Sequence, residues 1–145
     1  MKRVLGLLLA VAVSAGAALG ALRLTVPADK PGDVRRQLTF LRHELDRGAG
    51  DDAQANFPEG YFFLYALYGL TEIQLGLGEP PGDRADELRE ARWALERIDG
   101  DKGRAPFDPG LQPAYGIFYR GWANWLRGGV LALRPDPAQR ARFAS

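Results

Sequence analysis

The segment from Asn56 to Leu77, NFPEGYFFLYALYGLTEIQLGL, decides the fold that the sequence predicts. Residues 62–70 of this segment carry no charge. A helix on a protein surface has one apolar stripe and one polar face, whereas this segment is apolar nearly all round. We therefore predict a buried helix from Pro58 to about Gly76, with Leu67 as part of the core.

Two segments with a single apolar stripe flank the buried one and should cover it. The first follows Asp33, a favourable N-cap, and ends near Gly48; the second follows Asp83 and ends at Asp99-Gly100. Residues 48–54, GAGDDAQ, are predicted to form a polar loop, and residues 99–113 a loop rich in proline and glycine. The stripes consist of Val34, Leu38, Leu41 and Leu45 in the first segment and of Leu88, Ala91, Leu95 and Ile98 in the second.

A fourth helix, AYGIFYRGWANWLRGGVLAL, begins at Pro113 and ends before Pro135. Gly121 and Gly128 share its face with Ile117 and Asn124, which predicts a close approach by another helix. No segment alternates between apolar and polar residues over the length of a strand. The predicted class is all-α.

The order of these helices indicates an internal repeat. Charged amphipathic helices alternate with aromatic ones, and three aromatic residues recur after 54 positions. Residues 33–135 are therefore predicted to form two antiparallel helical hairpins, each with an outer amphipathic and an inner aromatic helix. Residues 136–145 look like the start of a third outer helix, so we expect a truncated chain. The matched residues are Tyr61, Tyr65 and Tyr68 in the first hairpin and Tyr115, Tyr119 and Trp122 in the second.

The N-terminus has the organisation of a targeting segment. Lys2 and Arg3 precede nineteen uncharged residues, 4–22, whose end is rich in alanine and glycine. Residues 1–23 are predicted to be a signal peptide or an uncleaved transmembrane anchor, because nineteen helical residues reach about 28 Å. Residues 24–32 form a linker. In both cases the remainder is predicted to be exported, and residues 4–22 contact the membrane if they are retained.

The two aromatic segments FPEGYFFLYALYGL and YGIFYRGWANWL carry a resemblance to a known family. Their alternation with amphipathic helices resembles the N-terminal hairpins of uncharacterised exported bacterial α/α-toroid proteins, over roughly Asp33 to Pro135. The resemblance implies that this chain is a partial toroid. In complete toroids about six hairpins surround a central cavity lined by the inner helices, and some members act on glycosides. The resemblance places no catalytic residue on this sequence.

The candidate site residues lie on the inner helices. On a helical wheel, the first aromatic stripe includes a carboxylate, Glu72, within about 40° of three tyrosines. Such a face can line a ligand cavity, or it can pack with its hydroxyl groups bonded to neighbours. The predicted ligand-lining residues are Tyr61, Tyr65, Tyr68, Glu72, Tyr115, Tyr119 and Trp122.

Other kinds of chemistry find little support in the sequence. A net charge of +1 gives no basic field for nucleic acid. Cysteine is absent and serine occurs only at residues 14 and 145, which excludes hydrolysis by a serine or cysteine nucleophile. His43, the single histidine, should be exposed, and Asp99 to Gly103 departs from a calcium loop at its fifth position. We predict no metal site and no cofactor.

Two functional hypotheses remain open. The first is an exported or membrane-anchored partial toroid with an aromatic inner face; the sequence leaves open whether it is an enzyme. The second is a small anchored helical module that binds a partner without catalysis. The sequence identifies neither a small-molecule nor a protein partner.

Overall fold

The structure, a computed structural model, describes residues 31–133, and every element within this range is helical. The predictions for the leader, residues 1–23, most of the linker and the third outer helix lie outside the described residues. The chain divides into two compact units after Arg36, and the account below concerns the second unit from Gln37 onward. The elements are α2 (Pro31–Asp46), α3 (Ala49–Asn56), α4 (Gly60–Gly78), the 3-10 turn η1 (Pro81–Asp83), α5 (Ala85–Asp99), α6 (Asp101–Arg104) and α7 (Gly116–Leu133).

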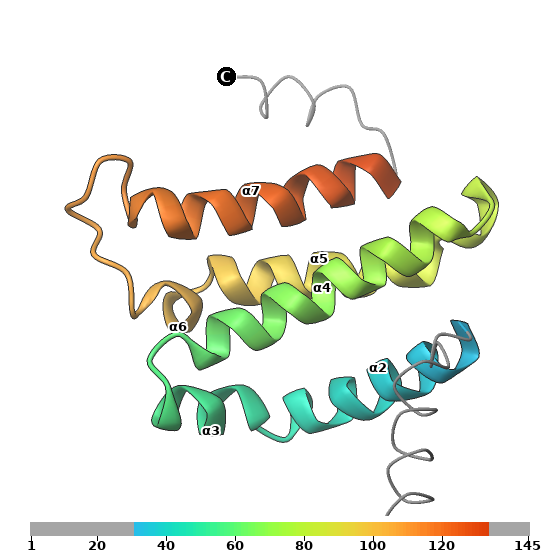
Figure 1. Ribbon diagram of the computed structural model, residues 1–145, viewed down its shortest axis with the longest axis horizontal. Helices are drawn as coiled ribbons and strands as arrows, with labels where there is room; N and C mark the ends of the chain where they lie inside the picture. Colours follow the sequence, from blue (N-terminus) through green and yellow to red (C-terminus); the bar gives the residue numbers. More distant parts are fainter. Residues whose placement is uncertain (1–30, 134–145) are drawn as a thin grey trace, which may run out of the picture. The chain divides into compact units, whose positions relative to one another are not determined.

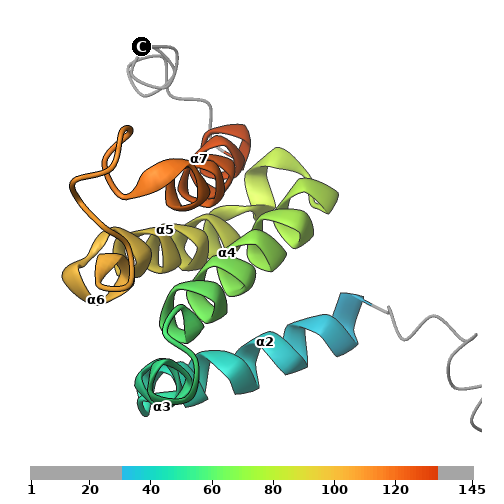
Figure 2. The ribbon, with the colours of Figure 1, turned by 60° about the vertical axis from the view of Figure 1, so that its left-hand side comes forward.

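The predicted central helix is α4, and it packs against α3, α5 and α7 (Figures 1 and 2). Its covered side carries Phe62, Ala66 and Ile73, all at most 2% exposed. The prediction that the whole helix is buried is wrong, because Leu67 is 51% exposed and Leu77 is 42% exposed. The neighbours within the described unit therefore leave Leu67 and Leu77 of α4 uncovered.

Glycines allow α4 to lie close to its neighbours. A Cβ atom on Gly69 would lie 2.8 Å from the Ala94 Cβ and 2.9 Å from Leu126 Cδ1, and one on Gly129 would lie 2.5 Å from Ile73 Cδ1. Both positions therefore need the absence of a side chain. Sequence reasoning expected the close approach at Gly121 and Gly128 instead. At Gly121 nothing described lies within 4 Å of an added Cβ.

Two short helices, α3 and α6, replace parts of the loops predicted over residues 48–54 and 99–113. Residues 49–56 form α3, whereas the sequence predicted a polar loop over residues 48–54. Gly48, in the left-handed region with φ 106°, ends the turn after α2, and Gly50 then lies against the aromatic rings of α4. A Cβ atom on Gly50 would lie 2.7 Å from Tyr65 Cε2. Packing against α4 thus holds a helix that its own composition does not indicate.

The remaining boundaries differ slightly from the predicted ones. Helix α2 begins at Pro31 rather than after Asp33, so the end of the predicted linker is helical. Asp83 lies in η1 and Arg84 occupies the position before α5, without a side-chain cap. Helix α7 begins at Gly116, three residues later than predicted. Within residues 31–133, no helix combines the length and the apolar character needed to cross a bilayer.

Candidate functional site

The predicted stripe on α4 faces inward. Tyr61, Tyr65, Tyr68 and Glu72 are between 2% and 6% exposed, so the structure brings these four residues together on the covered side of the helix. Tyr61 and Tyr65 lie with ring centroids 4.5 Å apart, and Tyr65 lies 5.2 Å from Trp93 of α5. The Tyr65 hydroxyl donates to the backbone carbonyl of Leu45 at the end of α2, at 3.4 Å.

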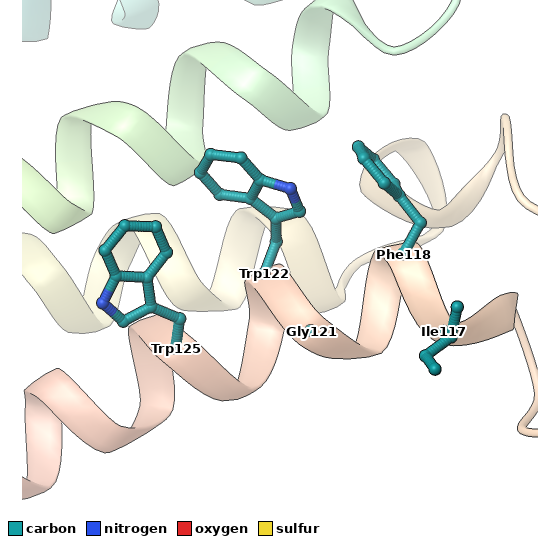
Figure 3. Close-up of a pocket in the computed structure, with 5 residues that line it drawn as sticks. All are labelled: Ile117, Phe118, Gly121, Trp122 and Trp125. Carbon is teal, nitrogen blue, oxygen red and sulfur yellow. The ribbon is translucent and has the colours of Figure 1, made fainter.

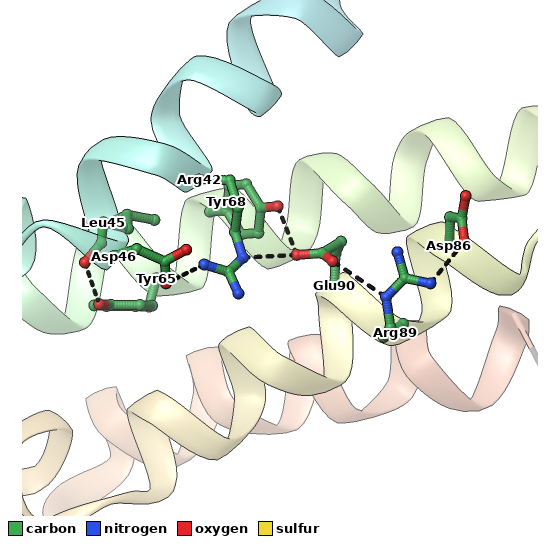
Figure 4. A network of polar contacts seen from close by, with 8 residues as sticks. All are labelled: Arg42, Leu45, Asp46, Tyr65, Tyr68, Asp86, Arg89 and Glu90. Atoms are coloured by element: carbon green, nitrogen blue, oxygen red, sulfur yellow. Dashed lines mark hydrogen bonds and ion pairs between the residues drawn. The ribbon is translucent and has the colours of Figure 1, made fainter.

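A polar network joins this stripe to α2 and α5 (Figure 4). The Tyr68 hydroxyl donates to Glu90 Oε2 at 3.0 Å, and Arg42 Nε donates to the same oxygen at 2.9 Å. The Arg42 guanidinium also lies 3.5 Å from the centroid of Trp93 and pairs with Asp46. Burial, together with the charges of Glu72 and Glu90, raises the pKa of Tyr68 above its ordinary value. Tyr68 is therefore a proton donor that stays neutral, and it holds Glu90 in place.

A pocket of about 220 Å³ opens beside the first two tyrosines. An ion pair between Lys102 Nζ and Asp51 Oδ1, 2.5 Å long, joins two of its walls. Arg97 lies 5.4 Å from the Trp93 centroid and forms no ion pair with another described residue. The pocket residues are Leu45, Asp46, Gly48, Asp51, Tyr61, Tyr65, Trp93, Arg97 and Lys102.

The three members of the predicted stripe on α7 lie in different environments in the structure. Tyr119 is 2% exposed, and its single hydroxyl proton is shared between Asp99 Oδ1 at 2.8 Å and the Ile98 carbonyl at 3.3 Å. Arg127 Nη2 lies 2.6 Å and 2.7 Å from the two carboxylate oxygens of Asp99. Tyr115 precedes α7 with φ 68° and contacts the rings of Tyr119 and the guanidinium of Arg104.

Trp122, the last predicted residue, lies in a different environment. It contacts Phe63 of α4 with centroids 5.5 Å apart, and it contacts Trp125 at the same distance. No ring contact among the described residues joins the tyrosines of α4 to Tyr115, Tyr119 or Trp122. The two stripes that the sequence matched therefore do not form one continuous surface within the described unit.

Trp122 belongs to a row of five aromatic rings on the surface, which we call the aromatic band. Neighbouring rings contact one another, with centroids 5.5 to 6.4 Å apart. Phe57 is 51% exposed, Phe118 47% and Trp125 60%. Figure 3 shows that the three α7 members project from the same side of the helix, which faces α4. The aromatic band consists of Phe57, Phe63, Phe118, Trp122 and Trp125.

A shallow groove of about 340 Å³ runs along α7 beside the aromatic band, from Ile117 to Trp125 (Figure 3). Ile117, 82% exposed, stands at one end and Trp125 at the other, with Gly121 between them. Helical spacing places Asn124 and Gly128 beside Ile117 and Gly121. We call Ile117, Gly121, Asn124, Trp125 and Gly128 the outer stripe; none of these side chains is charged.

The hydroxyl groups of Tyr65, Tyr68 and Tyr119 are engaged in structural contacts. Burial raises the pKa of Tyr65 to about 12 and that of Tyr119 to about 12. His43 is exposed, as the sequence predicted. Among the described residues, no three histidine, aspartate or glutamate side chains are placed to hold a metal ion.

Sequence reasoning missed most of the aromatic band. It named Trp122 but not Phe57, Phe63, Phe118 or Trp125, because it assigned aromatic residues to an interior. A usable signal was present: helical spacing sets Ile117, Phe118 and Trp125 apart from the side of α7 that Tyr119, Ala123 and Leu126 fill.

Comparisons with known proteins add no family. A scan against protein-family models and searches of curated proteins and of solved structures found no match to this chain. The functional argument therefore rests on the residues themselves.

Proposed function

We propose that this chain is an exported or membrane-anchored helical module that binds a protein partner through the aromatic band and the outer stripe of α7. The observation that carries the proposal is the row of touching rings of which Phe57, Phe118 and Trp125 are about half exposed. Monomeric soluble proteins seldom leave a contiguous apolar patch of this kind uncovered. Large aromatic side chains, tryptophan above all, dominate the energetics of protein interfaces.

The surroundings of the aromatic band favour an apolar partner. Of the basic residues on α7, Arg127 is paired with Asp99 and Arg120 Nε donates to the Ala114 carbonyl at 3.1 Å. Helix α4 carries no basic residue and only one acidic residue, Glu72, which is buried. A partner on the aromatic band would therefore bury apolar area and would meet no unpaired charge of α4 or α7 among these residues.

The interior favours binding over catalysis. The hydroxyl groups of Tyr65, Tyr68 and Tyr119 all donate to neighbouring carbonyl or carboxylate oxygens. Each of these bonds connects two helices, which is a structural task. The sequence places serine only at residues 14 and 145 and lacks cysteine, so the described unit has no serine or cysteine nucleophile.

A partial α/α-toroid is the second candidate, and one observation supports it. Tyr65 donates to the carbonyl near the end of α2, and Tyr119 donates to the carbonyl at the equivalent place in α5. In a toroid, a further hairpin would cover the aromatic band, and the seven predicted residues would line a ligand cavity. Both candidates require further protein on the aromatic band, and they differ in whether the same polypeptide or a partner supplies it.

A photocrosslinking experiment tests the proposal. A photoreactive phenylalanine analogue replaces Phe118 in the full chain, which is produced and irradiated in bacterial cells. We expect a covalent adduct larger than the chain. The matched control carries the analogue at Phe40 of α2, which is 67% exposed and lies outside the aromatic band. Adducts of equal yield at both positions, or at neither, contradict the proposal.

A reporter fusion tests the proposed location. A periplasmic reporter follows residue 145 of the full chain in a bacterial host. The basic start and the uncharged residues 4–22 predict activity outside the cytoplasm. A matched fusion without residues 1–23 should keep the reporter inside. Equal activity of the two fusions in the periplasm would show that residues 1–23 do not direct export.

A further inference from the structure

We infer that the partner on the outer stripe of α7 is a second copy of this chain, with the two α7 helices antiparallel; this inference rests on the proposed function. The argument starts from the shape of the stripe. Trp125 protrudes, 60% exposed, one helical turn away from Gly121, where the surface is bare to the backbone. A protrusion and a hollow on the same stripe can fit the corresponding features of another copy.

The spacing of the two features selects the antiparallel arrangement. A twofold axis makes each contact twice, so that the contact of residue i with residue j implies the contact of j with i. In an antiparallel pair, Trp125 of each copy fills the hollow over Gly121 of the other. In a parallel pair, each Trp125 would meet its own equivalent, and the two hollows would face each other and leave a void.

The polar groups on the stripe accept this pairing. No member of the outer stripe is charged, so apposing two copies brings no charged side chain of the stripe against its equivalent. The arginines beside the stripe are already bound within the chain, Arg127 to Asp99 and Arg120 to Ala114. Asn124 Oδ1 accepts a hydrogen bond from Arg127 Nη1 at 3.1 Å, and an amide oxygen has room for a second. The Asn124 amides near the twofold axis can therefore bond to each other.

The geometry gives two positions that behave differently. With Trp125 opposite Gly121, the twofold axis passes at the level of residue 123. The two Asn124 residues are then offset by about 3 Å along the helices, whereas the two Ile117 residues are about 18 Å apart. Helices packed about 8–10 Å apart bring facing Cα atoms to about 3–5 Å across the pair, so the axial offset decides which pair stays within the limit of about 7 Å for a disulfide. A cysteine at residue 124 should therefore join two copies, and one at residue 117 should not.

The chain has no native cysteine, so any disulfide between two copies must join the introduced cysteines. The full-length variants Asn124→Cys and Ile117→Cys are produced in bacterial cells, oxidised and run on a denaturing, non-reducing gel. We expect a band of twice the chain mass for Asn124→Cys, at least tenfold stronger than for Ile117→Cys. Ile117 is the more demanding control, because at 82% exposure it favours random collisions.

A third variant shows whether the outer stripe brings the copies together. Gly121→Leu added to Asn124→Cys fills the hollow, and nothing described lies within 4 Å of the new Cβ, so the monomer keeps its fold. We expect the double variant to lose the dimer band while its circular dichroism matches that of Asn124→Cys. A dimer band that persists overturns the inference, because the copies then meet elsewhere.

The remaining outcomes separate this inference from the proposed function. Dimer bands of similar strength for both single variants overturn the antiparallel pairing. A dimer band for neither variant, together with a Phe118 adduct of a mass other than twice the chain, overturns the second copy as partner and leaves the binding module intact. If neither a dimer band nor a Phe118 adduct is observed, both the second copy as partner and the binding module are overturned.

Discussion

Tyr65 and Tyr119, 54 positions apart, make the same contact in the two halves of the described unit. Each hydroxyl donates to the carbonyl of the last buried apolar residue of the preceding amphipathic helix, Leu45 at 3.4 Å and Ile98 at 3.3 Å. The last carbonyls of a helix lack partners within the helix, so each tyrosine adds a hydrogen bond at the end of the helix that precedes it. The Leu45 carbonyl also accepts one from the Gly48 N–H at 3.3 Å.

Removing these hydroxyl groups should lower stability. We expect Tyr65→Phe to reduce the free energy of unfolding by about 0.5–1.5 kcal/mol, the usual contribution of one hydrogen bond. Tyr119→Phe should cost more, about 1.5–3 kcal/mol, because Tyr119 also donates to the carboxylate of Asp99. Denaturant unfolding of the full chain measures both effects.

The control for this pair is Tyr115→Phe. The Tyr115 hydroxyl forms no hydrogen bond with another described residue, and the phenyl ring can keep the contact with Tyr119. We expect a change below about 0.5 kcal/mol. Three equal changes would contradict the contribution of the Tyr65 and Tyr119 hydrogen bonds to stability.

The same tyrosines predict a loss of stability at alkaline pH. Burial raises the pKa of Tyr65 and of Tyr119 from 10.0 to about 12. The unfolded chain releases these protons near pH 10, whereas the native state holds them until about pH 12. Their contribution is therefore complete below pH 10 and is lost as the pH rises from 10 to 12.

Absorbance at 295 nm and circular dichroism, recorded against pH on one sample, test this expectation. The tyrosinate signal of Tyr65 and Tyr119 should appear together with the loss of helix. The Tyr65→Phe/Tyr119→Phe variant should show a weaker dependence of stability on pH between 10 and 12. Ionisation of all five tyrosines near pH 10 with the helices intact would rule out the shifted pKa values.

Two glycines of α7 should respond in opposite ways to alanine. Gly129→Ala places a Cβ atom 2.5 Å from Ile73 Cδ1, so overpacking should cost about 1–3 kcal/mol despite the gain in helix propensity. Gly121→Ala meets nothing described within 4 Å and should stabilise the monomer by about 0.5–1 kcal/mol. Thermal melts at low protein concentration compare them. A stabilising Gly129→Ala would show that α4 and α7 are not packed closely there.

The network around Glu90 should contribute more than the surface ion pairs. Arg42 and Glu90 have side chains 27% and 21% exposed, and Tyr68 shares the same carboxylate oxygen. We expect Glu90→Gln to cost about 1–2 kcal/mol, because it weakens the hydrogen bonds to Arg42 and Tyr68. Asp86→Asn breaks the pair with Arg89 at 78% and 65% exposure and should change stability by less than about 0.5 kcal/mol. Equal effects of the two variants would refute this role of Glu90.

The periodicity of the sequence predicted the parts of this fold that depend on local pattern. The stripes ending in Leu45 and Ile98 gave the two amphipathic helices, and the recurrence of Tyr65 at Tyr119 gave equivalent contacts. The tertiary environment determined the rest. Residues 49–56 are helical because Gly50 lies under the rings of Tyr61 and Tyr65, and no local pattern encodes that contact.

The candidate site was predictable only in part, for a related reason. The pattern placed Tyr61, Tyr65, Tyr68 and Glu72 on one side of a helix, as the structure has them. It could not show that α3 and α5 cover that side, nor that Leu67 and Trp125 would stay exposed. Burial depends on how many neighbours a helix has, and an apolar sequence does not give that number.

The central claim is that a partner covers the aromatic band in the cell, and the reactivity of Trp125 tests it most directly. Hydroxyl radicals are generated in cells that produce the full chain and, separately, in a dilute solution of the purified chain; mass spectrometry then gives the oxidised fraction of Trp125 relative to that of Phe40. Both side chains are more than half exposed in the isolated chain, at 60% and 67%. The account predicts that Trp125 is protected at least fivefold in cells while Phe40 is unchanged. Equal oxidation of Trp125 in cells and in dilute solution would contradict it.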